Sequence, residues 1–389
     1  MGTMAKALIL GAGFGGLAAA HEIKRRAPDA AVTLVDRSDG FVVGATKTWV
    51  MLGDRTPEEV VRARERVAKV GVEFLEAEVT AIDPASRTVT TAAGTLEADY
   101  IVVALGAELG MDVVPGLETA ETFYTLEGAI RLRDVLTSFE SGRLVLLIPA
   151  VPIKCPPAPY EAALLLHEHF ERRGIRDRVE LSLHTVEPAP MPTAGPGMGS
   201  LIRGELEGRG IGYFPGHTAE AVDPEAKVVR FAGGEEAVYD LLVAIPAHRA
   251  PTVVREAGLA GEAGWIQVDA ATMETWYPGV YAAGDVTVVP LPGRYAPDRP
   301  LVLPKAGVFA EKHGRVAGAH IAARIRGEES PEAFDGVGFC YLEVGAGEAI
   351  RADGEFFALP HPSVAGRPAD REQYEDKVRW VEGILETYL

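Results

Sequence analysis

The sequence predicts an α/β protein with two Rossmann-like dinucleotide-binding domains and a small C-terminal α+β domain. Three observations support this prediction. A glycine-rich turn follows the first apolar strand, a strand–helix–strand order recurs later in the chain, and further strands and one amphipathic helix close it. We expect a first, discontinuous dinucleotide-binding domain at residues 1–111 and 252–327, a second, degenerate one at 112–251, and a third domain at 328–389.

The size and charge of the chain narrow its class. Its 389 residues are enough for two or three domains with a large core. The formal net charge of −18 argues against a nucleic-acid partner and against attraction to an anionic membrane through net charge. No apolar run reaches the roughly 18 residues that a membrane span needs. The glycines near the N-terminus fit a nucleotide turn better than a signal peptide, so we expect a cytoplasmic protein.

The first domain opens with a complete dinucleotide fingerprint. A strand at Lys6–Leu10 is followed by a glycine turn and a helix that runs to about Arg26, and a second strand, Ala31–Val35, ends at Asp36. The turn contains the three glycines of the pattern, Gly11, Gly13 and Gly16. They allow a tight turn, a close approach of the pyrophosphate and close packing of the helix, and Asp36 would accept from the ribose hydroxyls.

The rest of the first domain is less regular. We expect a loop and short helix lying against a ligand at Phe41–Gly53, and a solvated amphipathic helix at Pro57–Val70. A small meander should follow, with strands at Val72–Leu75, Val79–Asp83 and Thr88–Thr91. The strand Glu97–Ala104 then ends at Gly106, where the chain crosses to the second domain.

The second domain repeats the topology with a changed first turn. Strand Leu144–Ile148, helix Tyr160–Arg173 and strand Val179–Thr185 form its first unit. A long loop at Glu187–Gly199, a helix at Ser200–Arg209 and a strand at Tyr239–Ile245 should follow. In the turn after its first strand, Cys155-Pro156-Pro157 replaces the glycines. Prolines lack the N–H donors that hold a phosphate, so we expect no nicotinamide nucleotide here.

Cys155 and Cys340 are the only cysteines of the chain. A lone cysteine is most often a small buried hydrophobe, whereas two in an otherwise cysteine-free chain suggest a redox pair. Cys155 precedes a helix N-terminus and follows Lys154, and both features favour a thiolate. Glu161, about one helical turn further, could exchange protons or could simply stabilise the first turn of the helix.

The chain then returns to the first domain. The strand before Gly284-Asp285 has an ending typical of flavin enzymes, in which the aspartate accepts from ribityl hydroxyls. Lys305 precedes a helix predicted at Val308–Ile325, whose N-terminus carries about half a positive charge. Aimed at the pyrimidine edge of a flavin, the helix and Lys305 would stabilise the reduced, anionic form.

The C-terminal part should hold strands near Gly338–Val344 and Glu355–Leu359 and a terminal helix. The helix has one wide apolar face. That face could pack against the core or a second subunit, or could touch a membrane surface, although several acidic residues on the other face weaken the last alternative. The same sequence places Lys377 on the polar face; its apolar positions are Tyr374, Val378, Trp380, Val381, Ile384, Leu385 and Tyr388.

At this point the chain resembles the sulfide:quinone oxidoreductases and flavocytochrome c sulfide dehydrogenases, two-dinucleotide-domain flavoproteins. The general motifs are Gly11–Gly16 with Asp36, the strand end at Gly106, and Gly284-Asp285. More specific marks are the Cys155–Glu161 turn, Trp49-Val50 with Gly53, Pro304–Gly307, and Cys340-Tyr341. Many quinone reductases of the group carry a third, upstream cysteine that this chain lacks.

The resemblance implies FAD as the cofactor, no metal, and a catalytic pair of Cys155 and Cys340 beside the flavin, with Glu161 near them. Hydrosulfide would attack a Cys155–Cys340 disulfide, and electrons would pass through FAD to a quinone. Two alternatives stay open: a sulfide dehydrogenase flavin subunit that donates to a cytochrome c, and a flavin-binding redox sensor without turnover. Peripheral contact with a membrane and a homo-oligomer are also left open.

Overall fold

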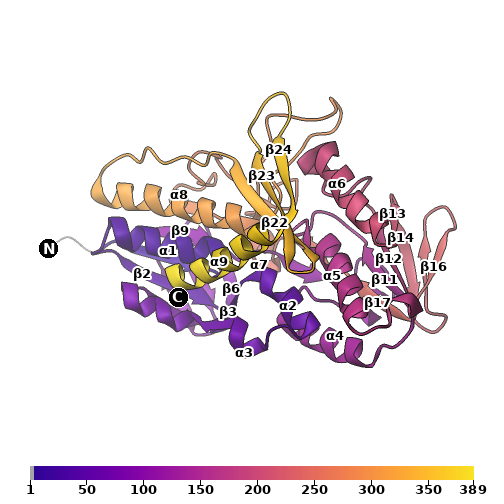
Figure 1. Ribbon diagram of the computed structural model, residues 1–389. Helices are drawn as coiled ribbons and strands as arrows, with labels where there is room; N and C mark the ends of the chain where they lie inside the picture. The colour runs from indigo at the N-terminus through magenta and orange to yellow at the C-terminus, as the bar shows by residue number, and fades with distance from the viewer. Residues whose placement is uncertain (1–3) are drawn as a thin grey trace.

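The computed structural model describes residues 4–389 and has the predicted α/β architecture (Figure 1). Its first unit is built on a five-stranded parallel sheet in the order β20-β9-β1-β2-β5. The strands are β1 (Lys6–Leu10), β2 (Ala31–Asp36), β5 (Glu73–Glu76), β9 (Tyr100–Val103) and β20 (Val280–Ala282). The last of these comes from far along the chain and pairs with β9.

Two helices, α1 (Phe14–Arg26) and α8 (Gly307–Arg326), lie side by side against this sheet. Glycines bring their backbones together, since a Cβ on Gly314 would lie 2.0 Å from the carbonyl oxygen of Gly15. The same unit contains a smaller sheet in which Ile82 and Val89 are buried, so one face of this sheet packs on the core. That sheet is an antiparallel meander of β6 (Val79–Asp83), β7 (Thr88–Thr91) and β8 (Gly94–Glu97).

Short elements complete the first unit. Strand β3 (Gly40–Val42) pairs with β4 (Val61–Ala63), and α2 (Lys47–Leu52) ends at Gly53 in the left-handed conformation. Helix α3 is limited to Pro57–Val60, and a 3₁₀ segment covers Arg64–Val70. The remaining short elements are α7 (Thr252–Glu256), β19 (Ile266–Gln267) and β21 (Thr287–Val288).

The second unit is a four-stranded parallel sheet in the order β13-β12-β11-β17. Its strands are β11 (Gly142–Ile148), β12 (Val179–Thr185), β13 (Gly212–Pro215) and β17 (Leu241–Ala244). Its helices are α4 (Leu126–Ser138), α5 (Ala158–Arg172) and α6 (Gly195–Gly208). An antiparallel meander lies beside the sheet and consists of β14 (Ala219–Asp223), β15 (Val228–Phe231) and β16 (Glu236–Val238).

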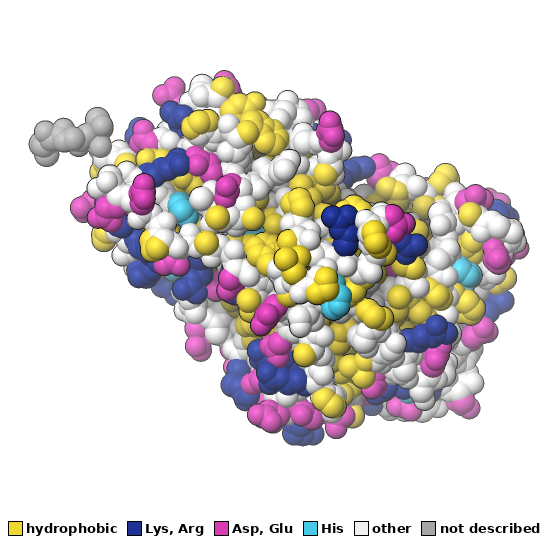
Figure 2. Space-filling view, turned by 90° about the horizontal axis from the view of Figure 1, so that it is seen from above, with side chains coloured by type: hydrophobic (Ala, Val, Ile, Leu, Met, Phe, Trp, Pro, Cys, Tyr) yellow, Lys and Arg dark blue, Asp and Glu magenta, His cyan; other side chains and the backbone are white. Residues whose placement is uncertain are grey.

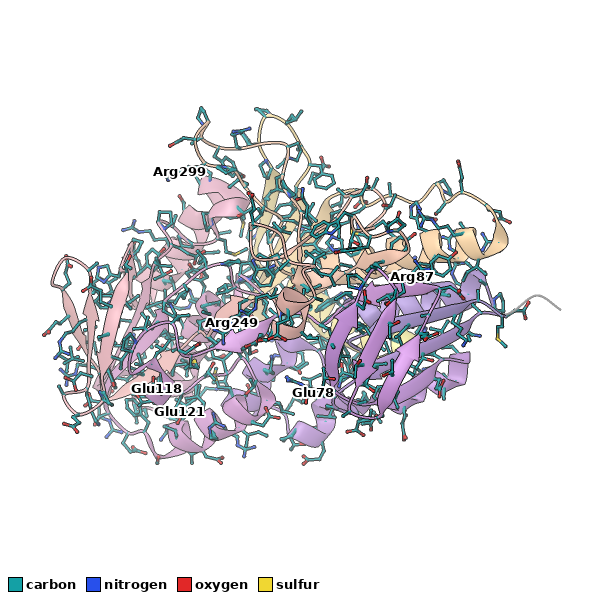
Figure 3. The ribbon with its side chains drawn as sticks, turned by 180° about the vertical axis from the view of Figure 1, so that it is seen from behind. Glu78, Arg87, Glu118, Glu121, Arg249 and Arg299 are labelled. Atoms are coloured by element: carbon teal, nitrogen blue, oxygen red, sulfur yellow. The ribbon has the colours of Figure 1, made fainter. Side chains whose placement is uncertain are left out.

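The two chain crossings between these units run side by side. Strand β10 (Glu108–Gly110) pairs antiparallel with β18 (Ala247–Arg249). Arg249 binds Glu108 at 3.1 Å and Asp112 at 3.0 Å, and it lies between the two sheets in Figure 3. The crossings therefore form a braced connection, although the exact domain boundaries stay a prediction.

The C-terminal unit is an antiparallel sheet covered by one helix. It contains β22 (Val337–Gly345), β23 (Glu348–Glu355), β24 (Ser363–Asp370) and α9 (Arg371–Tyr388). Helix α9 begins at the cap Asp370, whose side chain accepts from the Gln373 N–H. Val381, Ile384, Leu385 and Tyr388 are buried, so most of its apolar face packs on the core. No helix within residues 4–389 is long and apolar enough to cross a membrane.

Several predicted elements were wrong. The helix expected at Pro57–Val70 stops at Val60, because residues 61–63 pair with β3 instead. The strand expected at Val72–Leu75 pairs with β2 in the main sheet and takes no part in the meander. Helix α6 begins at Gly195, inside the predicted loop at Glu187–Gly199. In the C-terminal sheet, the strand expected at Glu355–Leu359 lies earlier, at Glu348–Glu355, and β24 was missed.

Candidate active site

A cavity of about 740 Å³ lies where the three units meet. Eight of the predicted site residues line it although they come from all three units: Gly13, Gly106, Cys155, Glu161, Gly284, Asp285, Lys305 and Cys340. The other three predicted residues, Gly11, Gly16 and Asp36, lie outside the lining. The cavity wall is mainly apolar and aromatic, with a few buried charged groups among the lining residues.

The glycine turn has the geometry that a bound pyrophosphate needs. Gly11 has φ +96°, and a Cβ there would lie 2.3 Å from the Ala104 carbonyl oxygen. A Cβ on Gly16 would lie 1.8 Å from the carbonyl oxygen of Gly11, so the helix can approach the strand only through glycine. A Cβ on Gly13 would meet nothing within 4 Å, which leaves its backbone open toward the cavity.

Asp36 lies at the end of β2, directly over this turn. One carboxylate oxygen accepts from the Ala12 N–H at 2.8 Å, and the other is 3.2 Å from the Arg64 guanidinium. Arg64 also donates to the Ala12 carbonyl at 3.0 Å and lines the cavity. It was expected on a solvated helix and was missed as a site residue. Arg64 was missed because a helix was predicted at Pro57–Val70, whereas residues 61–63 form a strand whose pairing turns Arg64 inward.

Asp285 and Lys305 form another part of the cavity wall. Burial raises the pKa of Asp285, although Lys305, Lys154 and Lys47 favour its ionised form. The ammonium of Lys305 donates to the carbonyl oxygens of Asp285 at 2.6 Å and Thr287 at 3.1 Å, and lies 3.4 Å from the Trp265 ring centre. Burial lowers the pKa of Lys305 to about 8. Its donors are thus largely used within the protein.

These residues fit FAD. The open backbone at Gly13 suits the pyrophosphate, Asp36 stands at the ribose position, and the buried Asp285 carboxylate faces a cavity large enough for a flavin. The positive end of α8 begins at the same wall, at Gly307. Within residues 4–389 no group of three or more His, Cys, Asp or Glu side chains could hold a metal ion.

Cys155 and Cys340 are both free thiols that line this cavity, Cys155 before α5 and Cys340 on β22. They are close enough that ionisation of Cys155 would raise the pKa of Cys340. Cys155 has φ +53°, a conformation costly for a side chain other than glycine. Its N–H donates to the Lys305 carbonyl at 2.7 Å, so the turn is fastened to the start of α8.

The expected thiolate at Cys155 was wrong for this structure. Burial raises the pKa of Cys155 to about 12, with a further contribution from the Glu161 carboxylate. The cations that oppose this rise are Lys377 and Lys47. The helix N-terminus and Lys154 do not outweigh desolvation, which disfavours any charged form in a closed site.

Sequence reasoning missed two further parts of the wall. Lys47 donates to the Tyr124 carbonyl at 2.5 Å, and burial together with Lys154 lowers its pKa to about 7. Lys377 is 1% exposed and forms an ion pair with Glu161, which is itself 2% exposed. Because Lys377 lies 216 positions from Glu161, no local pattern could have joined them.

The fold and the cavity define a two-nucleotide-domain flavoprotein, an FAD-dependent oxidoreductase. The family model described as pyridine nucleotide-disulphide oxidoreductase matches residues 5–322, and the chain belongs to that family. The sulfide-quinone reductase of Aquifex aeolicus is 27% identical over 364 residues, which cover 91% of this chain and 83% of that protein. The mitochondrial sulfide:quinone oxidoreductase of Mus musculus is 24% identical over 367 residues, which cover 91% of this chain and 78% of that protein.

The solved structure of the Aquifex aeolicus sulfide:quinone oxidoreductase superimposes with a TM-score of 0.88 at 24% identity, over 99% of this chain and 91% of that one. The resemblance noted from the motifs is therefore confirmed, as are the fold class and FAD.

Proposed function

We propose that this protein oxidises sulfide, or a closely related sulfur compound, through Cys155 and Cys340 and passes the electrons to a quinone. The observation that carries the proposal is the meeting of these two cysteines, 185 positions apart, in the wall of the flavin cavity. The similarity to sulfide-quinone reductases over most of the chain supports the substrate and the acceptor.

In the oxidised enzyme the two cysteines form a disulfide. The sulfur of hydrosulfide attacks one sulfur of that bond, a new S–S bond forms on the attacked cysteine, and the other cysteine leaves as a thiolate. FAD, when bound, accepts the electron pair that this chemistry makes available. Glu161, whose carboxyl lies in the same wall, exchanges the proton.

An aromatic group of the cavity wall supports a flat, apolar electron acceptor. Trp380 stacks on Phe14 with ring centres 6.0 Å apart and an interplanar angle of 6°. Phe339, directly before Cys340, meets Trp380 edge-on at 6.1 Å. Such rings offer the faces on which a quinone can stack.

The test is steady-state turnover with sulfide and a soluble quinone. Turnover with quinone supports the proposal. Flavin reduction by sulfide that needs a cytochrome c for reoxidation would indicate a sulfide dehydrogenase subunit, and co-purification of a haem protein would agree with that. A flavin that sulfide does not reduce would contradict the proposal and leave a sensor role.

A further inference from the structure

A buried cluster of charges lies behind Cys155 and joins the second unit to the C-terminal unit. It consists of Glu161 on α5, Glu343 on β22 and Lys377 on α9. The side chains are only 3%, 6% and 2% exposed, respectively. The Lys377 ammonium donates to one carboxylate oxygen of Glu161 and to one of Glu343.

Glu343 is held more firmly than Glu161. Besides Lys377, the indole N–H of Trp49 donates to the same Glu343 oxygen at 2.7 Å. Lys377 also lies 5.4 Å from the Trp49 ring centre. Glu161 receives, in addition to Lys377, only a long bond of 3.4 Å from the backbone N–H of Glu343. Glu343 therefore has two firm side-chain donors, Trp49 and Lys377, whereas Glu161 has only Lys377.

The charges of this cluster do not balance. Two carboxylates face one ammonium, which would leave one excess negative charge in a site closed to water. A single proton removes the excess. Glu161 is the carboxyl that can gain it, since it alone of the two lines the cavity. Burial, opposed by Lys377 and assisted by the Glu343 carboxylate, raises the pKa of Glu161 to about 7.

We propose that Glu343, held by Lys377 and Trp49, is a positioning residue that sets whether Glu161 carries the proton exchanged with the sulfur chemistry at Cys155. This inference rests on the proposed function for the source of the proton. When ionised, Glu161 takes a proton from H₂S, and the hydrosulfide formed in this way attacks the disulfide. The S–S bond then breaks, one cysteine gains the new sulfur, and the other leaves as a thiolate, so no further oxidant is required for this step.

The other groups around Glu161 determine what a pH profile would report. Those on the elements packed against it are Cys155 before α5, Cys340 on β22, Lys47 on α2, Tyr374 on α9, and Tyr124. Burial raises the pKa of both cysteines to about 12, and it raises the pKa values of both tyrosines. Two neighbours titrate in the same range as Glu161: Lys47, and Glu187, which accepts from the Tyr160 hydroxyl on α5; each has a pKa of about 7.

Two substitutions distinguish the titration of Glu161 from that of its neighbours, because they should shift the pKa of Glu161 in opposite directions. Glu343→Gln keeps the shape and the Trp49 contact but removes a negative charge, so the pH midpoint for flavin reduction by sulfide should fall by about one unit or more. Lys377→Gln removes the cation and should raise the midpoint. The matched control is Glu168→Gln, because Glu168 also joins α5 to the C-terminal sheet, at Ala346 N–H (2.9 Å), outside the cavity.

The measurement is the rate of anaerobic flavin reduction against pH, read as the difference from wild type because sulfide itself ionises near neutrality. Shifts down for Glu343→Gln, up for Lys377→Gln and none for Glu168→Gln are expected. Equal midpoints in Glu343→Gln and wild type would overturn the proposal. General damage to the site would lower rates without moving the midpoints in opposite directions.

A second readout does not need activity. Infrared spectra of the wild type at pH 6 should show the carbonyl stretch of a buried protonated carboxyl that disappears in Glu161→Gln and fades at lower pH in Glu343→Gln. If that band is absent, or unchanged in Glu161→Gln, the proton does not lie on Glu161 and the inference fails. If sulfide does not reduce the wild-type flavin but the band behaves as described, the proposed function fails and the shared-proton site stands.

Discussion

At the scale of single residues, Cys155 shows how burial decides reactivity. Its thiol is held in a left-handed turn against Lys305, and its pKa is raised to about 12. A thiol with such a pKa is a poor nucleophile at neutral pH. The chemistry therefore begins more readily with hydrosulfide attacking a disulfide than with Cys155 attacking a substrate. Lys47 and Lys377, which favour the thiolate, then stabilise the charge released in the exchange.

Replacing either cysteine by serine should abolish flavin reduction by sulfide while leaving FAD bound. The double variant should be no worse than either single one, because the pair acts as one unit. The measurement is anaerobic reduction of the flavin absorbance, with the FAD content of each variant as the control. A Cys340→Ser variant with unchanged sulfide turnover would reduce Cys155 to an inert loop residue.

Glu161 should also leave a mark on stability. Its pKa is about 7 when folded against about 4.5 when unfolded, so the folded state binds the proton more tightly. The resulting stability is complete below pH 4.5 and is lost as the pH rises through 7. Glu161→Gln lacks this loss, and its free energy of unfolding relative to wild type should rise by about 3 kcal/mol over that interval. Urea unfolding at several pH values measures it, and a pH-independent difference would contradict it.

At the scale of elements, two glycines of the same turn have different roles: Gly13 serves FAD binding and Gly16 serves folding. Gly13 has φ −85° and open space around it, whereas Gly16 is pressed against Gly11. Gly13→Ala should therefore leave the stability of the FAD-free protein unchanged and weaken FAD binding, because the new methyl group points to the pyrophosphate side. Gly16→Ala should destabilise the FAD-free protein itself by at least about 1–3 kcal/mol. Thermal unfolding and FAD titration distinguish the two effects, and equal stability losses would refute the assignment.

The two strand–helix turns show how much of the fold and of the site the sequence could predict. The strand–turn–helix of Lys6–Arg26 carries its own signals in glycine spacing and apolar periodicity, so it was found with its glycines. The turn at Cys155 was recognised as lacking phosphate-binding glycines for the same local reason. Proline replaces the donors there, and this is visible without any structure.

The charge cluster could not be predicted in this way. Lys377 sits among acidic and apolar residues of α9 and was assigned to its solvated face, yet it is 1% exposed. Its partners come from α5 and β22, so only the packing of three elements explains why a lysine is tolerated inside. The strand pairing of residues 61–63, which turns Arg64 inward, likewise depends on a partner that lies 19 to 23 positions earlier, at Gly40–Val42.

At the scale of the whole molecule, the cavity exists because the three units close around it. Figure 2 views the molecule from above and shows hydrophobic side chains gathered in the middle of this face, with acidic ones mostly toward its margins. The chain as a whole carries a net charge of −18, whereas the buried wall holds Lys47, Lys154 and Lys305 near Asp285. These lysines favour the ionised form of the Asp285 carboxyl and so oppose the effect of its burial.

The second unit should not serve nicotinamide nucleotides. Its turn holds prolines where phosphate-binding glycines would stand, and Glu187, just past the end of β12, already accepts from the Tyr160 hydroxyl at 2.5 Å. We expect NADH and NADPH to reduce the flavin poorly or not at all. Rapid, stoichiometric bleaching by either nucleotide would show that the domain still binds them.

The most direct test of the account is anaerobic titration of the yellow protein, followed by absorbance. Sulfide should bleach the flavin, a soluble quinone should restore its colour, and NADH should leave it unchanged. Bleaching by NADH together with no response to sulfide would contradict the central claim that the cysteine pair, and not a nicotinamide, delivers electrons to the flavin.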